Sequence, residues 1–123
     1  MRFDHDLQSS YAEVFLSLRE LILAFDELTE HKITNQTSYK DADGMAIVLM
    51  KVREEGVRLV FGRGAQLQKK YPFLQGKGKT VRYLVLDTVE AIDAVPLREM
   101  IQESLILAVE HRHMRRLRGR LGS

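Results

Sequence analysis

Apolar residues recur along the chain with two different periods, and each period predicts a different kind of element. A spacing of three and four residues starts at Leu7 and predicts an amphipathic helix that ends near Thr29. Asp6 or Ser10 is expected to cap this helix, since Ser10 has Glu13 three residues later. Because large apolar side chains stabilise a fold when buried, we expect the stripe to lie on a sheet. The stripe comprises Leu7, Tyr11, Val14, Phe15, Leu18, Leu21, Ile22 and Phe25.

A period of two, typical of strands, follows in the middle of the chain. Residues 31–40 alternate loosely and predict one or two short strands near a sheet edge. Residues 45–52 are an almost continuous apolar run, which predicts a central strand. A tight turn at Gly56 then leads into residues 57–61, and residues 80–86 alternate again. These strands predict a largely antiparallel sheet.

The last third of the chain predicts a helix and then a tail. Asp87 and Glu90 form a capping-box pattern for a short helical turn, and Pro96 suits the first turn of a final helix. Beyond residue 109 most apolar residues are lost, and the last glycines predict fraying. The apolar positions of the final helix are Leu97, Met100, Ile101, Leu105, Leu107 and Ala108.

Together these elements predict one α+β domain over residues 1–123, with an N-terminal and a C-terminal helix packed on a mostly antiparallel sheet. The core is expected at about residues 7–109, and residues 110–123 are expected to form a basic C-terminal tail. The chain is 45% hydrophobic and 29% charged, which is a globular composition, and it has no cysteine for disulfides or thiol catalysis. Without an export signal or a long apolar run, we expect a cytoplasmic protein with no membrane partner.

Charge is segregated along the chain, although the net charge is only +2. The first 30 residues are acidic, residues 51–82 are basic, and the end of the chain carries five arginines. The near-neutral total and the lack of obvious aromatic residues beside the basic segment argue against nucleic acid as a partner.

Carboxylates recur every seven residues at Asp6, Glu13, Glu20 and Glu27. On a single helix they form a row along one face, about 10 Å apart. The row is either the solvated side of an amphipathic helix or a surface that attracts cations or a partner protein. The candidate metal-binding residues are Glu13, Glu20 and Glu27, although carboxylates so far apart cannot chelate one ion together.

A basic, glycine-rich connection joins the last two predicted strands. Its cations Arg63, Lys77 and Lys79, with Arg82 just after it, are the candidate anion-binding residues. Backbone donors at glycines together with cations suit phosphate or carboxylate. The alternative is that the glycines form turns and the lysines keep the surface soluble. The sequence Gly-Lys-Thr at residues 78–80 lacks the first glycine of a phosphate-binding loop and precedes a strand.

Several short motifs follow one another along the chain, at residues 18–22, 60–67 and 74–79, at Arg82, and at Ile92 with Asp93. Their order and spacing resemble those of the YdhG-like family of small bacterial domains. The resemblance covers about residues 7–109 and implies a compact α+β domain with helices packed on an antiparallel sheet.

One branch of that family is described as frataxin-like, so the resemblance also implies intracellular iron handling, with iron as cargo and a metal-delivery protein as partner. No arrangement of nucleophile and base in the sequence identifies an enzyme. Two alternatives stay open: a binding module for anions or phosphate ligands at the basic connection, and a protein-interaction domain.

Overall fold

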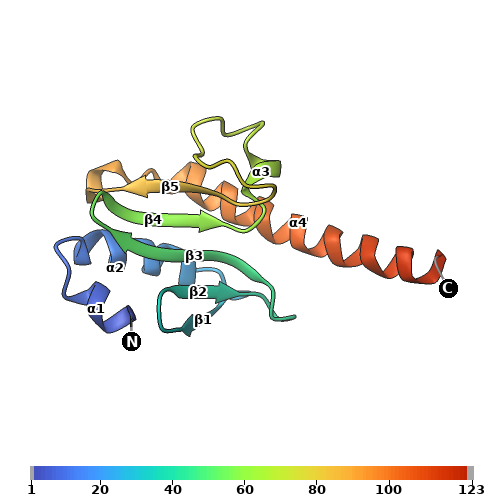
Figure 1. Ribbon diagram of the computed structural model, residues 1–123, viewed down its shortest axis with the longest axis horizontal. Coiled ribbons are helices and arrows are strands. Elements are labelled where there is room, and N and C mark those ends of the chain that lie inside the picture. The colour runs from blue at the N-terminus through green and yellow to red at the C-terminus, as the bar shows by residue number, and fades with distance from the viewer. Residues whose placement is uncertain (1, 122–123) are drawn as a thin grey trace.

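The computed structural model describes residues 2–121 and confirms the α+β class (Figure 1). Five strands form one sheet in the order β1-β2-β3-β4-β5, and every neighbouring pair is antiparallel. The strand predicted to be central, β3, is the middle one. The strands are β1 (Thr29–Lys32), β2 (Thr37–Lys40), β3 (Ala46–Arg53), β4 (Gly56–Phe61) and β5 (Arg82–Leu86). The helices are α1 (Arg2–Leu7), α2 (Ala12–Leu23), α3 (Gly64–Leu67) and α4 (Ala94–Leu121), with a 3-10 turn at Val89–Ala91.

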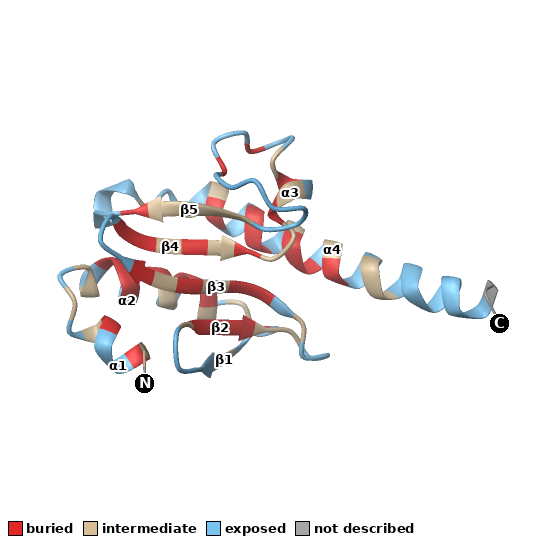
Figure 2. Ribbon diagram, in the orientation of Figure 1, coloured by how far each residue is buried: buried red, intermediate tan, exposed pale blue. Residues whose placement is uncertain are grey.

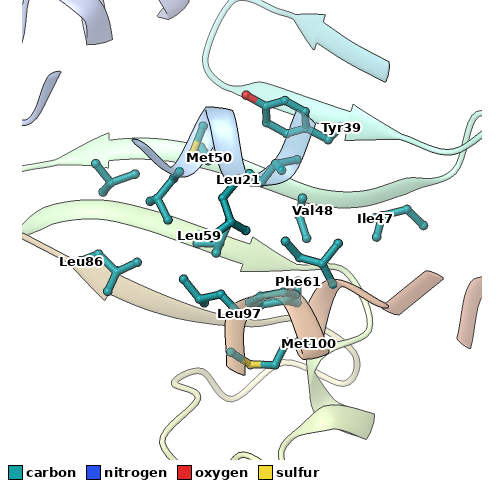
Figure 3. Packing of buried hydrophobic residues seen from close by; sticks show 14 of the residues in the cluster. Leu21, Tyr39, Ile47, Val48, Met50, Leu59, Phe61, Leu86, Leu97 and Met100 are labelled. Carbon is teal, nitrogen blue, oxygen red and sulfur yellow. The ribbon is translucent and has the colours of Figure 1, made fainter. Parts of the chain in front are cut away.

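The core lies between the sheet and the two long helices. In β3 and β4 alternate residues point to this side, so Met50 stands opposite Leu59 and both are fully buried. Figure 3 shows Leu21 of α2 near Met50 and Leu59, and Leu97 of α4 near Phe61, and all of them belong to one core. Both long helices therefore cover the same face, as the apolar stripes predict. In the described residues no helix is long and apolar enough to cross a membrane.

The N-terminal helix predicted from Leu7 to near Thr29 is wrong at both bounds, because α2 begins at Ala12 and ends at Leu23, and Thr29 begins β1. A turn separates α1 from α2. In this turn Ser9 Oγ donates a hydrogen bond of 2.7 Å to the carbonyl oxygen of Asp6. Tyr11 is the N-cap of α2 and makes no side-chain cap bond, so neither Asp6 nor Ser10 caps it. Phe3 of α1 is buried, which places the start of the core before residue 7.

Asp6 is fully buried, although the sequence places it in a row of surface carboxylates. Its Oδ1 lies 2.9 Å from Arg2 Nε in an ion pair within α1. Burial raises the pKa of Asp6, and the charges of Arg2 and His5 offset only part of that effect.

Glu30 ties α2 to the edge of the sheet. It accepts hydrogen bonds from Arg19 Nε at 2.7 Å and from the Tyr39 hydroxyl at 2.9 Å, so one carboxylate of β1 joins α2 and β2. Burial alone favours a higher pKa for Glu30, but these two hydrogen bonds and the charge of Arg19 together hold its pKa below the usual value. This is a structural ion pair, because both partners are satisfied within the fold.

The C-terminal helix is longer than predicted, since α4 continues to Leu121 and does not fray after residue 109. Figure 2 shows its first half buried on the sheet and its last turns exposed. Arginine, leucine and methionine are strong helix formers, and the single glycine at 119 costs only about 1 kcal/mol. Arg112 also pairs with Asp41 and Asp43 in the turn between β2 and β3. Gly122 lies outside the described residues.

The short turn before α4 forms where expected, with a different cap. Thr88 precedes Val89–Ala91, and its Oγ1 accepts a hydrogen bond of 3.2 Å from the Ala91 N–H. The predicted pair of Asp87 and Glu90 does not supply this cap. Threonine performs the same role, because its hydroxyl oxygen reaches an N–H that has no partner in the first turn.

We expect Leu18→Ala to lower the free energy of unfolding by about 2–5 kcal/mol, because Leu18 is fully buried on α2 and its removal leaves a cavity. Leu16→Ala on the same helix is the matched control, since Leu16 is 45% exposed and should change stability by less than about 0.5 kcal/mol. Urea denaturation of both variants provides the measurement. Equal midpoints for the two variants would refute the assigned buried face.

Candidate anion-binding site

Arg82 braces the basic connection from inside. Its Nε donates to Gln68 Oε1 at 2.9 Å, and its Nη1 donates to the carbonyl oxygens of Val81, at 2.7 Å, and of Gly78. These bonds hold the glycine-rich segment against the start of β5. The Nε and Nη1 groups of Arg82 are therefore engaged by the fold.

Close backbone approach explains the glycine at the start of α3. A Cβ on Gly64 would lie 2.7 Å from the backbone nitrogen of Arg82, closer than side chains normally come. A hydrogen bond of 2.8 Å from the Ala65 N–H to the Thr80 carbonyl oxygen fastens the same contact. This contact positions the residue just before Gly64, which is Arg63.

The four predicted anion-binding residues are not brought together. Lys77 and Lys79 are exposed on the connection, and Arg82 is directed into it. Arg63 instead faces α4 and lines a hollow of about 190 Å³ between α3 and α4. Within residues 2–121, Arg63 is the one member of the predicted set that lines this hollow.

The hollow is strongly cationic. Arg63 and Gln66 line one wall, and α4 supplies His111, Arg115 and Arg118 on the other. These three α4 residues are spaced i, i+4 and i+7, which places them on one face of the helix. Glu110 is the carboxylate of the lining, so three guanidinium groups stand against one negative charge. The arrangement suits an anion.

Arg63 has an unsatisfied donor at this site. Its Nε is buried and has no hydrogen-bond partner within the described chain. A buried donor without a partner costs about 1–3 kcal/mol, and more when the group is charged.

The environment of the hollow lowers the pKa of His111. Desolvation and the nearby charges of Arg63, Arg115 and Arg118 lower the pKa of its imidazole. The ring is therefore held neutral at pH values where an ordinary histidine begins to carry a proton. A bound anion would reverse the effect of the three arginines and raise the pKa of His111.

Recognition of an oxyanion is the chemistry that this arrangement can perform. Guanidinium groups bind phosphate and carboxylate through pairs of parallel hydrogen bonds, and the volume is below the roughly 300–1,000 Å³ of typical sites for larger ligands. The lining contains no serine, threonine or cysteine that could act as a nucleophile.

The predicted carboxylate row is dispersed by the fold. Glu13 and Glu20 remain exposed on α2, but Asp6 is buried in α1, and Glu27 lies in the turn after α2. Glu27 lines a separate groove beside Asp41 and α4. No group of three or more histidine, aspartate or glutamate side chains placed to hold a metal ion occurs in the described residues.

Sequence reasoning missed Arg115, Arg118 and His111 because they fall in the segment assigned to a frayed tail. Their regular spacing was the available signal, together with the high helix propensity of the residues between them. No family model, curated protein or solved structure matches the chain. The resemblance to the YdhG-like family therefore stays a prediction.

We expect Gly64→Ala to destabilise the protein by about 1–3 kcal/mol and to displace Arg63, because the added methyl group meets the backbone of Arg82. Gly78→Ala is the control in the same connection, since its nearest neighbour would be the Val81 carbonyl oxygen at 3.9 Å. Thermal denaturation and the chemical shift of the Arg63 Nε–H group measure the two effects. Equal behaviour of the two variants would show that the close approach does not position Arg63.

Proposed function

We propose that this protein is a binding module for a phosphate-class oxyanion, held in the hollow between α3 and α4. The observation that carries the proposal is the convergence of Arg63, Arg115 and Arg118 on one small hollow. None of the three forms an ion pair within residues 2–121. Other arginines of the protein, such as Arg19 and Arg112, are paired with carboxylates of the fold.

Arginines that face one another repel, so an anion bound between them lowers the electrostatic energy of the hollow. An anion removes that repulsion and accepts hydrogen bonds from the guanidinium groups. A solubilising role does not require Arg63, Arg115 and Arg118 to converge on one hollow. The site therefore supports anion binding better than a purely solubilising role.

This proposal keeps the predicted ligand class and changes the site. Lys77, Lys79 and Arg82 are replaced by Arg115, Arg118 and His111 as the partners of Arg63. Iron handling stays a prediction that rests on the resemblance alone. It receives less support from the geometry because Glu13, Glu20 and Glu27 do not share one helix.

Sulfate tests the proposal, because it stays fully charged across the range in which histidine titrates. We expect sulfate to raise the pKa of His111 and to bind more tightly as the pH falls from about 7 to about 5. The sign follows from linkage: an anion that favours protonated His111 is itself favoured by that protonation. NMR titration of the histidine rings measures the pKa of His111 and the affinity for sulfate. Added sulfate should leave the ring signals of His31 on β1 unchanged.

Arg118→Gln should weaken sulfate binding by about 10-fold or more, which corresponds to the loss of a charged hydrogen bond. Lys69→Gln removes the same charge from an exposed position outside the hollow and serves as the matched control. Equal sulfate affinity in the two variants, or an unchanged His111 pKa in wild-type protein with sulfate, would refute the site.

A further inference from the structure

The last part of α4 projects beyond the sheet as a helix with little of the domain around it (Figure 1). Residues 113–120 are all exposed, whereas Met100, Ile101 and Ala108 earlier in the helix are buried. A helix end in water gains nothing from packing, so its charges decide what it can bind.

The charges on this projecting segment are almost all positive. Residues 110–121 contain five arginines and one acidic residue, Glu110. Arg112 is paired with Asp41 and Asp43, but Arg116 follows it at i+4 and Arg120 follows Arg116 at i+4. Like charges at this spacing destabilise a helix, so a polyanion that neutralises them also stabilises the segment.

The arginines occupy opposite sides of the helix. Successive residues turn by about 100°, so Arg116 and Arg118 point in nearly opposite directions. Arg118 faces the hollow beside α3, whereas Arg116 lines a shallow surface depression with Arg112 and Arg115. Arg115 belongs to both, so the cationic surface is continuous around this side of α4.

One small anion cannot contact both sides of a helix, but a groove with phosphates on both walls can. The major groove of B-form DNA is about 12 Å wide, and a helix with its side chains is about 10–12 Å across. We infer that the projecting end of α4 binds the phosphates of double-stranded DNA without reading its sequence. This inference rests on the proposed anion site, which in the complex with DNA binds one backbone phosphate.

Other polyanions fit the arrangement less well. A flexible single strand or an acidic polypeptide loses conformational entropy if it bends around the helix to contact the arginines on both sides. Double-stranded RNA has a deep, narrow major groove that does not admit the helix. The net charge of the whole chain and the lack of aromatic residues beside the basic connection predicted no nucleic-acid partner, but the net charge hides the concentration of arginine on this one segment.

Fluorescence anisotropy with a labelled 20-base-pair DNA duplex tests the inference in the full chain. If Arg115, Arg116 and Arg118 each neutralise a phosphate, affinity should fall about fortyfold between about 50 and about 200 mM salt. Arg116→Gln should reduce the salt slope by about 1 and weaken duplex binding by about five- to tenfold at about 0.1 M salt. Glutamine keeps the helix propensity, which circular dichroism verifies.

Arg116→Gln separates this inference from the proposed function, because Arg116 does not line the hollow. The variant should lose duplex affinity while its sulfate affinity is unchanged, and Lys69→Gln should retain both. Normal sulfate binding with no duplex binding would overturn the inference and leave the anion site standing. Equal affinity for the single strand, for double-stranded RNA or for polyglutamate of matched charge would also overturn it, the last indicating an acidic protein partner.

Discussion

The packing of the first half of α4 on the sheet sets the position of the exposed end of this helix, which lies outside the core. Leu97, Met100 and Ile101 lie in the same apolar layer as Phe15 and Leu18 of α2. Because a helix is stiff, fixing its first turns on the sheet also fixes the direction of the turns that follow. The arginines after residue 111 are therefore held at defined positions, although few of them contact the rest of the domain.

A second constraint positions Arg63 on the wall of the hollow that lies opposite α4. Gly64 packs directly on the backbone of Arg82, and Arg82 in turn binds the carbonyl oxygens of the connection. Arg82, which the sequence predicted to bind an anion, thus holds the basic connection in place. Arg63 is the predicted anion-binding residue that faces outward, toward α4.

The sequence predicted the elements that depend on local periodicity. The α2 stripe, the central position of β3 and the hairpin turn at Gly56 are confirmed, because buried faces leave a clear pattern of apolar residues. The interruption at Ser9 and the continuation of α4 were not predicted. The first involves a side-chain hydrogen bond to the backbone, and the second is supported by an ion pair from Arg112 to Asp41, 71 residues earlier. The hollow was missed for the same reason, since it joins segments far apart in the chain.

The ion pairs of Arg112 with Asp41 and Asp43 attach the end of α4 to the turn between β2 and β3. The nine residues beyond Arg112 extend about 13 Å, so a tilt of about 20° at this point would move the tip by about 5 Å. The pKa of Asp41 is lowered, because hydrogen bonds from Met45 and Arg112 outweigh the effect of its partial burial. The carboxylate therefore keeps its charge well into the acidic range. The direction of the exposed end of α4 is therefore tied to the turn between β2 and β3 as well as to the core.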